Sequence, residues 1–197
     1  MELLCQRPCN SGFFLAGIDY NTAMRKIHIG HGGHLLDGWE NYEKDEVDIM
    51  QPLHWEDCSV DRIFLEHVLE HVPHPHGYCF LREANRVLKP GGILRVIVPD
   101  VVQISRNTTD AYAAFIKDRT HRTPVDAIIG CWGHWASYTA DMLEVFLKEA
   151  GFSECRRCAP LCSDDKCLIG IDQHHKEIGD EFNRIESVIF DAYKGYI

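Results

Sequence analysis

The sequence predicts an α/β domain with a mainly parallel sheet. Short segments rich in β-branched and apolar residues alternate with longer segments whose apolar residues recur every three to four positions. Glycine or proline stands at several of the junctions, where these residues end regular structure. The chain has 197 residues and 45% hydrophobic content, enough to bury one core. We therefore expect a single domain over residues 1–197.

Four strands are expected in the first third of the chain. The first begins at Lys26 and ends at the glycines that follow it. Residues 40–43 and 47–50 are predicted to form two short strands, and residues 60–66 a stronger one. The connections among the first three strands are very short, so helices should be reduced there.

A helix and a buried strand are expected next. Apolar residues recur at helical spacing over 80–88, and the run 89–92, KPGG, supplies the cationic, helix-ending and turn residues of a helix C-terminus. Residues 93–98 are almost continuously apolar, which is typical of a strand buried on both faces of a sheet.

The last quarter of the chain is predicted to close the sheet. Thr139 is a suitable N-cap for an amphipathic helix that stops at Gly151. Residues 152–159 and 186–193 are expected to be closing strands. The polar stretch 163–183 between them is expected to be a variable loop.

Composition narrows the class of protein and its partners. The formal net charge is −10 and no run of Lys and Arg appears, so duplex nucleic acid is not expected as a partner. No apolar run is long enough to span a bilayer, and the first residues lack the pattern of a secretion signal. We expect a cytoplasmic protein with no membrane partner. The nine cysteines, an odd number, favour reduced thiols.

Three glycines follow the first predicted strand in the run KIHIGHGG, residues 26–33. In an open α/β sheet the loop after the first strand is the usual floor of the ligand crevice. Glycines let the backbone approach a ligand, and the following amides can donate hydrogen bonds to a carboxylate. The spacing lacks the full GxGxxG pattern, so a structural turn remains an alternative. Glu43 ends the next predicted strand, where a carboxylate can accept hydrogen bonds from both ribose hydroxyls of a nucleoside.

These motifs carry a family resemblance. The runs IGHGGHLLDGWENYE, DIMQPLHWEDCSVDRIFLEHVLEHV and LREANRVLKPGGILRVIVPD resemble class I S-adenosylmethionine-dependent methyltransferases, especially the small bacterial type-11-like group. The resemblance implies a Rossmann-like, mainly parallel twisted sheet with flanking helices and an antiparallel closing strand. It implies a cofactor-binding half over residues 26–100 and an acceptor-side and closing half over 101–197, after an N-terminal segment, 1–25. The implied cofactor is S-adenosyl-L-methionine and the implied product is S-adenosyl-L-homocysteine.

The resemblance also implies a set of cofactor-binding residues. It places the methionyl end of the cofactor against the glycine loop, the ribose at the end of the second strand, the adenine just beyond, and the sulfonium beside the end of the strand at 60–66. The residues concerned, in that order, are Gly30, His31, Gly32, Glu43, Asp48, Ile49, Glu66 and His67.

The scarcity of helix-forming residues among the first three strands departs from the usual family pattern. It should leave one face of the sheet thinly covered, and exposed apolar surface of that kind often marks an interface. We therefore expect a homodimer.

Three histidines are candidates for taking a proton from the methyl acceptor. Histidine titrates near neutrality and can act as a general base. His67 and His71 should lie near the transferred methyl group, and His134 lies in the run GCWGHW, whose tryptophans could wall an acceptor pocket. A hydrogen-bonded structural role is the alternative for His134.

Two other functions compete with methyl transfer. The run HVLEH matches the HxxEH motif of zinc hydrolases, in which His67 and His71 would bind the metal and Glu70 would activate water. Pro73 and Pro75 follow at once and should curtail the helix that this motif needs, so no metal ligand is assigned. A domain that binds the cofactor or its product without transferring a methyl group would carry the same binding motifs. For a transferase, the acidic balance favours a small-molecule acceptor.

Overall fold

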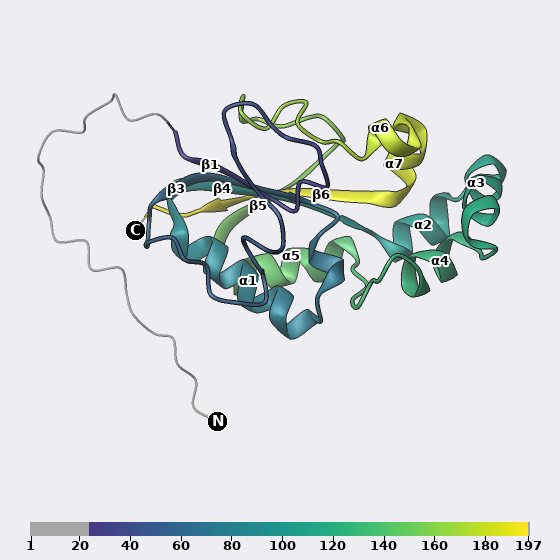
Figure 1. The fold of residues 1–197 in the computed structure, drawn as a ribbon, viewed down its shortest axis with the longest axis horizontal. Coiled ribbons are helices and arrows are strands. Elements are labelled where there is room, and N and C mark those ends of the chain that lie inside the picture. Colours follow the sequence, from purple (N-terminus) through teal and green to yellow (C-terminus); the bar gives the residue numbers. More distant parts are fainter. Residues whose placement is uncertain (1–23, 197) are drawn as a thin grey trace, which may run out of the picture.

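The computed structural model describes residues 24–196. These residues form a six-stranded mixed sheet with the strand order β2-β1-β3-β4-β6-β5 (Figure 1). Strands β2, β1, β3 and β4 run parallel, and β6 is antiparallel to both of its neighbours, β4 and β5. The elements are β1 (Lys26–Ile29), β2 (Glu40–Tyr42), β3 (Val60–Glu66), the 3₁₀ helix η1 (Leu69–His71), α1 (His74–Val87), β4 (Leu88–Pro99), α2 (Val101–Asn107), α3 (Asp110–Thr120), α4 (Pro124–Gly130), α5 (Ala140–Glu149), β5 (Phe152–Cys158), α6 (His175–Ile178), α7 (Asp180–Glu186) and β6 (Ser187–Lys194).

The predicted fold class is confirmed. Strands β1, β2 and β3 lie where the sequence predicts them, and the described chain forms no helix between β1 and β3. Thr139 caps α5 by accepting a hydrogen bond from the Met142 amide, and Gly151 follows the helix with a φ of +103°. The N-terminal segment 1–25 lies outside the described residues, apart from its last two.

Three predictions about local structure are wrong. Residues 47–50 form no strand: 47 and 48 are irregular, 49 and 50 lie in a turn, and the segment pairs with no described strand although Val47 and Ile49 pack into the core. Strand β4 begins at Leu88, so the expected turn at 89–92 is a bulge within the strand, where Gly91 has a φ of +75°. The expected loop at 163–183 contains α6 and most of α7.

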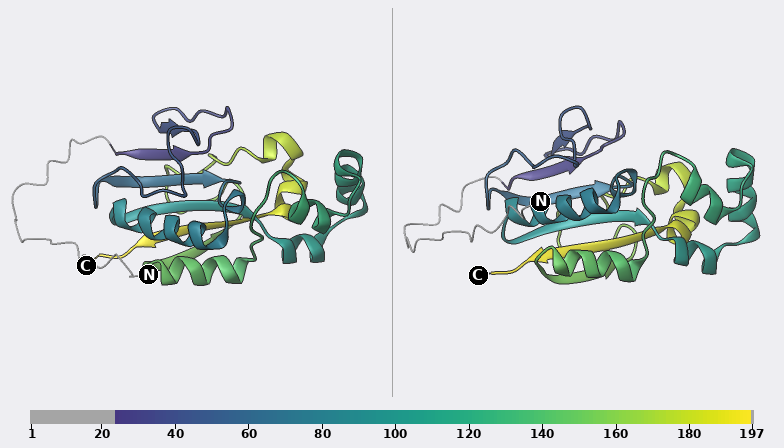
Figure 2. Two further views of the ribbon diagram at one scale, coloured as in Figure 1. Left: turned by 60° about the horizontal axis from the view of Figure 1, so that its bottom comes forward. Right: turned by 90° about the horizontal axis from the view of Figure 1, so that it is seen from below.

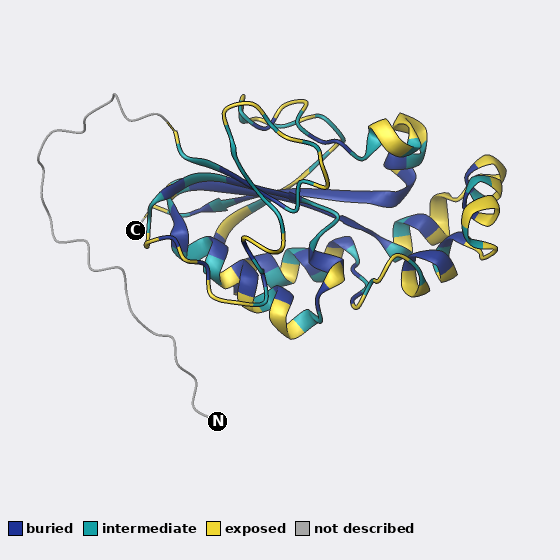
Figure 3. Cartoon of the chain, in the orientation of Figure 1, coloured by how far each residue is buried: buried dark blue, intermediate teal, exposed yellow. Residues whose placement is uncertain are grey.

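Helices α2, α3 and α4 are not among the elements predicted from the sequence. Their start signals are readable, since Asp100, Thr109 and Thr123 all accept hydrogen bonds from amides of the first turn that follows. The helices are short, and their apolar residues face each other and α7 rather than the sheet, so no long apolar stripe marks them. Together with α7 they form a separate group at the end of the sheet (Figures 1 and 3).

The two faces of the sheet are covered differently (Figure 1). Helices α1 and α5 cover one face, which Figure 2 shows in front, and bury the main core. On the other face Phe64, Ile97 and Ile189 are at most 1% exposed, and the side chains packed against them come mainly from loops, including Trp39 and Ile171. The expectation of a thinly covered apolar face is therefore wrong, because loops replace the missing helices.

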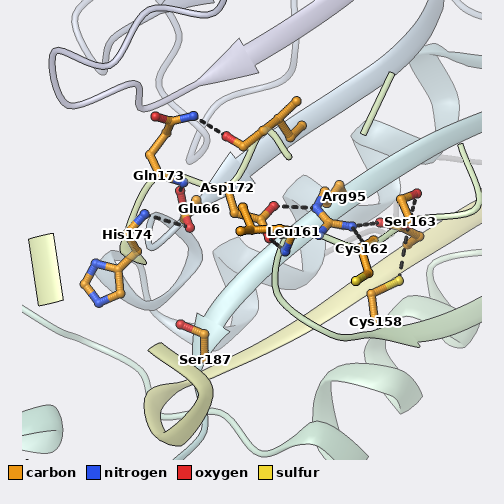
Figure 4. Close-up of polar contacts among 12 residues, drawn as sticks. Glu66, Arg95, Cys158, Leu161, Cys162, Ser163, Asp172, Gln173, His174 and Ser187 are labelled. Atoms are coloured by element: carbon orange, nitrogen blue, oxygen red, sulfur yellow. Dashed lines mark hydrogen bonds and ion pairs between the residues drawn. The ribbon is translucent and has the colours of Figure 1, made fainter. Parts of the chain in front are cut away.

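A buried ion cluster holds one of these loops in place (Figure 4). The Arg95 guanidinium donates two hydrogen bonds to Asp172, of 2.8 and 3.0 Å, and one of 2.8 Å to Asp191. All three side chains are 0% exposed. Burial opposes the charge on Arg95, but its bonds to Asp172 and Asp191 outweigh burial and raise its pKa. Asp172 Oδ2 also accepts a bond from Leu161 N, and the second oxygen of Asp191 accepts one from Ser163 Oγ, so every oxygen of the two carboxylates is paired.

Replacing Arg95 alone should strongly destabilise the protein. Arg95→Met leaves two buried carboxylates without their cation, which costs about 3–5 kcal/mol in the free energy of unfolding. Chemical denaturation of the two proteins measures this difference. Arg156→Met is the matched control, because the Arg156 ion pairs with Glu154 and Asp164 are exposed and should contribute little. Equal destabilisation by both substitutions would contradict the assigned role of Arg95.

Among the residues that the structure describes, none belongs to a helix with both the length and the apolar character needed to cross a membrane.

Candidate functional site

A cavity of about 460 Å³ lies at the edge of the sheet where the parallel strands end. Strand β1 leads into it through Gly30, His31 and Gly32, and β3 through Glu66 and His67. The carboxyl ends of parallel strands share one edge, so segments far apart in the sequence meet here. Helix α3 and the segment 173–178 supply further walls.

The glycine loop has the backbone that its sequence suggests. Gly30, Gly32 and Gly33 have φ values of +71°, +55° and +88°, a region that favours glycine. A Cβ on Gly30 would overlap the Val68 side chain, whereas one on Gly32 would meet no atom within 4 Å. Gly30 is therefore required by close packing, and Gly32 leaves open space.

The loop amides are already used by the protein itself. Gly32 N donates a 2.7 Å hydrogen bond to Glu43 Oε1, and Gly33 N donates one of 3.0 Å to His31 Nδ1. A carboxylate does bind this loop, as the glycine pattern suggests, but it belongs to Glu43.

Three of the predicted cofactor residues do not line the cavity: Glu43, Asp48 and Ile49. Asp48 Oδ1 accepts a bond from Met50 N, and Ile49 is 5% exposed in the main core. The other five, Gly30, His31, Gly32, Glu66 and His67, all line it.

Glu66 binds the segment 173–178, which forms another wall of the cavity. Its two oxygens accept hydrogen bonds from Gln173 N at 2.7 Å and His174 N at 3.2 Å (Figure 4). Burial raises the pKa of Glu66, and the two amide bonds limit the rise.

His67 joins a group that sequence reasoning missed. Its ring lies 4.0 Å from that of His174, measured between centroids, and its Nε2 is 3.1 Å from Ser187 Oγ. Glu186 pairs with His174 Nε2 at 3.2 Å and accepts a 2.8 Å bond from the Tyr112 hydroxyl. No spacing in the sequence links the other members of the group around His67: Tyr112 comes from α3, Glu186 and Ser187 from the junction of α7 and β6, and His174 from the segment predicted as a variable loop.

The two histidines of this group have opposite protonation tendencies. Burial, reinforced by His174, lowers the pKa of His67 to about 3. Burial also acts to lower the pKa of His174, but the bond to Glu186 outweighs it and the pKa is raised. His174 is therefore the stronger base of the two.

Glu70, His71 and His134 form a second group beside the first. Their potential ligand atoms all lie within 4.8 Å of one another. Burial raises the pKa of Glu70, which is 0% exposed, to about 7. His71 and His134 line the cavity with their rings edge to face, 4.9 Å apart. Trp132 also lines it, whereas Trp135 is 76% exposed and does not.

The class of fold is that of class I methyltransferases, and comparisons with known proteins agree. A family model described as "Methyltransferase domain" matches residues 4–96. No curated protein matches the sequence significantly. Together with the fold, the family match confirms the resemblance to class I S-adenosylmethionine-dependent methyltransferases of the type-11 group.

Three solved structures illustrate the likeness. A provisionally assigned O-methyltransferase from Nostoc punctiforme shares 15% identity over 89% of this chain and 53% of its own, with a TM-score of 0.53. The CurJ carbon methyltransferase shares 15% sequence identity over 88% of this chain and 49% of its own chain, with a TM-score of 0.51. A SAM-dependent methyltransferase from Archaeoglobus fulgidus shares 15% sequence identity over 87% of this chain and 86% of its own chain, with a TM-score of 0.50. At this identity the likeness establishes the fold.

The pairing of His174 with Glu186 should be visible in its titration. In wild-type protein the His174 midpoint should lie above 6.5, the ordinary value for histidine. Glu186→Gln removes the charge that outweighs burial, so the midpoint should fall. Histidine NMR signals followed against pH measure this, with His174 assigned from the spectrum of His174→Gln. Glu181→Gln, an exposed change at the start of α7, is the control. The same midpoint in wild type and Glu186→Gln would disprove the pairing.

Proposed function

We propose that the protein binds S-adenosylmethionine at the glycine loop and transfers its methyl group to a small-molecule acceptor in the adjoining cavity. The observation that carries the proposal is the position of Gly30, His31 and Gly32. They open into the main cavity at the carboxyl edge of a class I sheet, within the part of the sequence that matches the methyltransferase domain.

The cofactor contacts are proposed residue by residue. Gly30, His31, Gly32, Glu66 and His67 border the cavity and can contact the methionyl and sulfonium part. The ribose is proposed to bind Glu43 and the adenine to lie beside Asp48 and Ile49, on the β2 side of the glycine loop. Binding the ribose there requires Glu43 to release the Gly32 amide.

Methyl transfer is an in-line displacement whose main requirement is alignment of donor and acceptor. A base is needed only where the acceptor loses a proton. His67, His71 and His134 all border the cavity and remain candidates. His67, with its pKa near 3, is a weak base, and His174 is the better one in the same group.

The hydrolase alternative lacks the helix that it needs. His67 has a φ of +53°, and only Leu69–His71 is helical, as a single 3₁₀ turn before Pro73. The two histidines of the HxxEH run consequently join different groups, with His67 beside His174 and His71 beside His134.

A small acceptor fits the site better than a polymer. The cavity is of the size that encloses small ligands, and the net charge of −10 disfavours nucleic acid.

The expectation of a homodimer rests on an exposed apolar face of the sheet. Loops cover that face, so this observation no longer supports a dimer. A monomeric mass in light scattering would reject the dimer.

Calorimetric titration of metal-stripped protein with S-adenosylmethionine and S-adenosylhomocysteine tests the cofactor site. Saturable binding of either compound supports the proposal, and no binding of either rejects it. Release of S-adenosylhomocysteine on incubation with small hydroxyl and amine compounds then separates a transferase from a domain that only binds.

Gly32→Val should abolish this binding while the protein stays folded. The added side chain would project into the open space at the loop. Gly170→Val is the matched control, because Gly170 also has a positive φ, +73°, with open space around its Cβ, but lies away from the cavity. Binding at wild-type affinity in Gly32→Val would refute the assignment of the loop.

Glu43→Ala should weaken binding of S-adenosylmethionine by about 1–3 kcal/mol, through loss of a hydrogen-bonded carboxylate. The same calorimetric titration measures the change. Asp45→Ala, at an exposed neighbouring carboxylate, should leave affinity unchanged. Equal affinities of Glu43→Ala and wild type would remove Glu43 from the site.

A further inference from the structure

The second histidine group has the composition of a metal site. Glu70 and His71 come from η1, and His134 comes from the loop between α4 and α5. Each offers one ligand atom, and these atoms lie within 4.8 Å of one another. We propose that Glu70, His71 and His134 bind a divalent cation, with zinc the best match, at the wall of the cavity.

The Glu70 carboxylate is buried and lacks hydrogen bonds from the described residues. The residue is 0% exposed, and within the described part of the chain neither of its oxygens has a hydrogen-bond partner. Oε1 lies 3.2 Å from His67 Nδ1, but the two atoms do not meet in hydrogen-bond geometry. A buried carboxylate without a partner is costly, and a cation between Glu70 and the two imidazoles removes that cost.

His134 is held in the form that a metal ligand needs. Its Nδ1 lies 2.6 Å from the Ile128 carbonyl oxygen, which can only accept, so Nδ1 carries the proton and Nε2 keeps its lone pair. A ligating histidine commonly donates its other N–H to a backbone carbonyl in this way, and that bond fixes both ring orientation and tautomer.

The neighbouring group, His67, His174 and Glu186, is a poorer candidate, although its ligand atoms also lie within 4.8 Å of one another. Both oxygens of Glu186 are already engaged, by His174 and by Tyr112, and His67 is paired with Ser187. A cation there would have to displace these partners, whereas neither oxygen of Glu70 accepts a hydrogen bond from a described residue, and its one close polar neighbour is His67 Nδ1 at 3.2 Å.

The chemistry of the site follows from its ligands. Two imidazoles and one carboxylate suit zinc, and three protein ligands leave a fourth position open. His71 and His134 border the cavity and Glu70 does not, so the open position faces the cavity. It can take a water or an oxygen of a bound acceptor. This set differs from the HxxEH set, because His134 replaces His67.

Zinc titration of the metal-stripped, full-length protein, in competition with a chromophoric chelator, tests the site. Wild type should bind one zinc per chain. His71→Asn changes an exposed residue and leaves the fold intact, and it should weaken binding by more than about tenfold. Glu70→Gln should do the same. His76→Asn, at an exposed histidine outside both groups, and His174→Gln should retain wild-type affinity.

Several outcomes would overturn the proposal. These are the absence of zinc binding by wild type, binding unchanged in His71→Asn, or binding lost in His174→Gln, which would assign the metal to the neighbouring group. A cobalt(II) adduct with a thiolate charge-transfer band would assign it to cysteines. None of these measurements uses S-adenosylmethionine, so failure of the metal site and failure of the proposed function are distinguishable.

Discussion

The buried guanidinium of Arg95 is the constraint on which the functional edge of the sheet depends. It lies in β4 and is bound by Asp172 and by Asp191 of β6, so one cation ties the central strands to a loop that has no helix or strand of its own around residue 172. Asp172 is followed directly by the two residues whose amides bind Glu66. The ion cluster thus holds the loop against the sheet, and the bonds to Glu66 hold the next two residues, so that His174 lies at the cavity.

The same loop covers a face of the sheet that would otherwise be exposed, because the connections between β1 and β3 are short. A mainly parallel sheet is normally covered by helices on both faces. Here the described residues place α1 and α5 on one face only, and loop residues such as Trp39 and Ile171 bury Phe64, Ile97 and Ile189 on the other. A loop that covers a sheet also buries polar groups, which need hydrogen-bond partners. Here Asp172 accepts a bond from Leu161 N and Asp191 accepts one from Ser163 Oγ.

Sequence reasoning succeeded where the signal is local. Strand β3, the capped start of α5 and the glycines after β1 follow from periodicity, capping and turn chemistry within a few residues. It failed where tertiary contacts decide. Residues 47–50 look like a strand yet only fill the core, and α2 to α4 bury their apolar residues against each other. His174 and Glu186 could not be found, because the only signal for them is their proximity in the fold to His67.

The bond between Gly32 and Glu43 means that the glycine loop is satisfied before any ligand arrives. A simple anion that bound the Gly32 amide would have to displace the Glu43 carboxylate and would offer that carboxylate no new hydrogen-bond donor. If the cofactor binds here as proposed, it must offer an acceptor to the Gly32 amide and hydroxyl donors to the released Glu43 carboxylate. The proposed site would then favour molecules that carry both functions over acetate-like or phosphate-like ions.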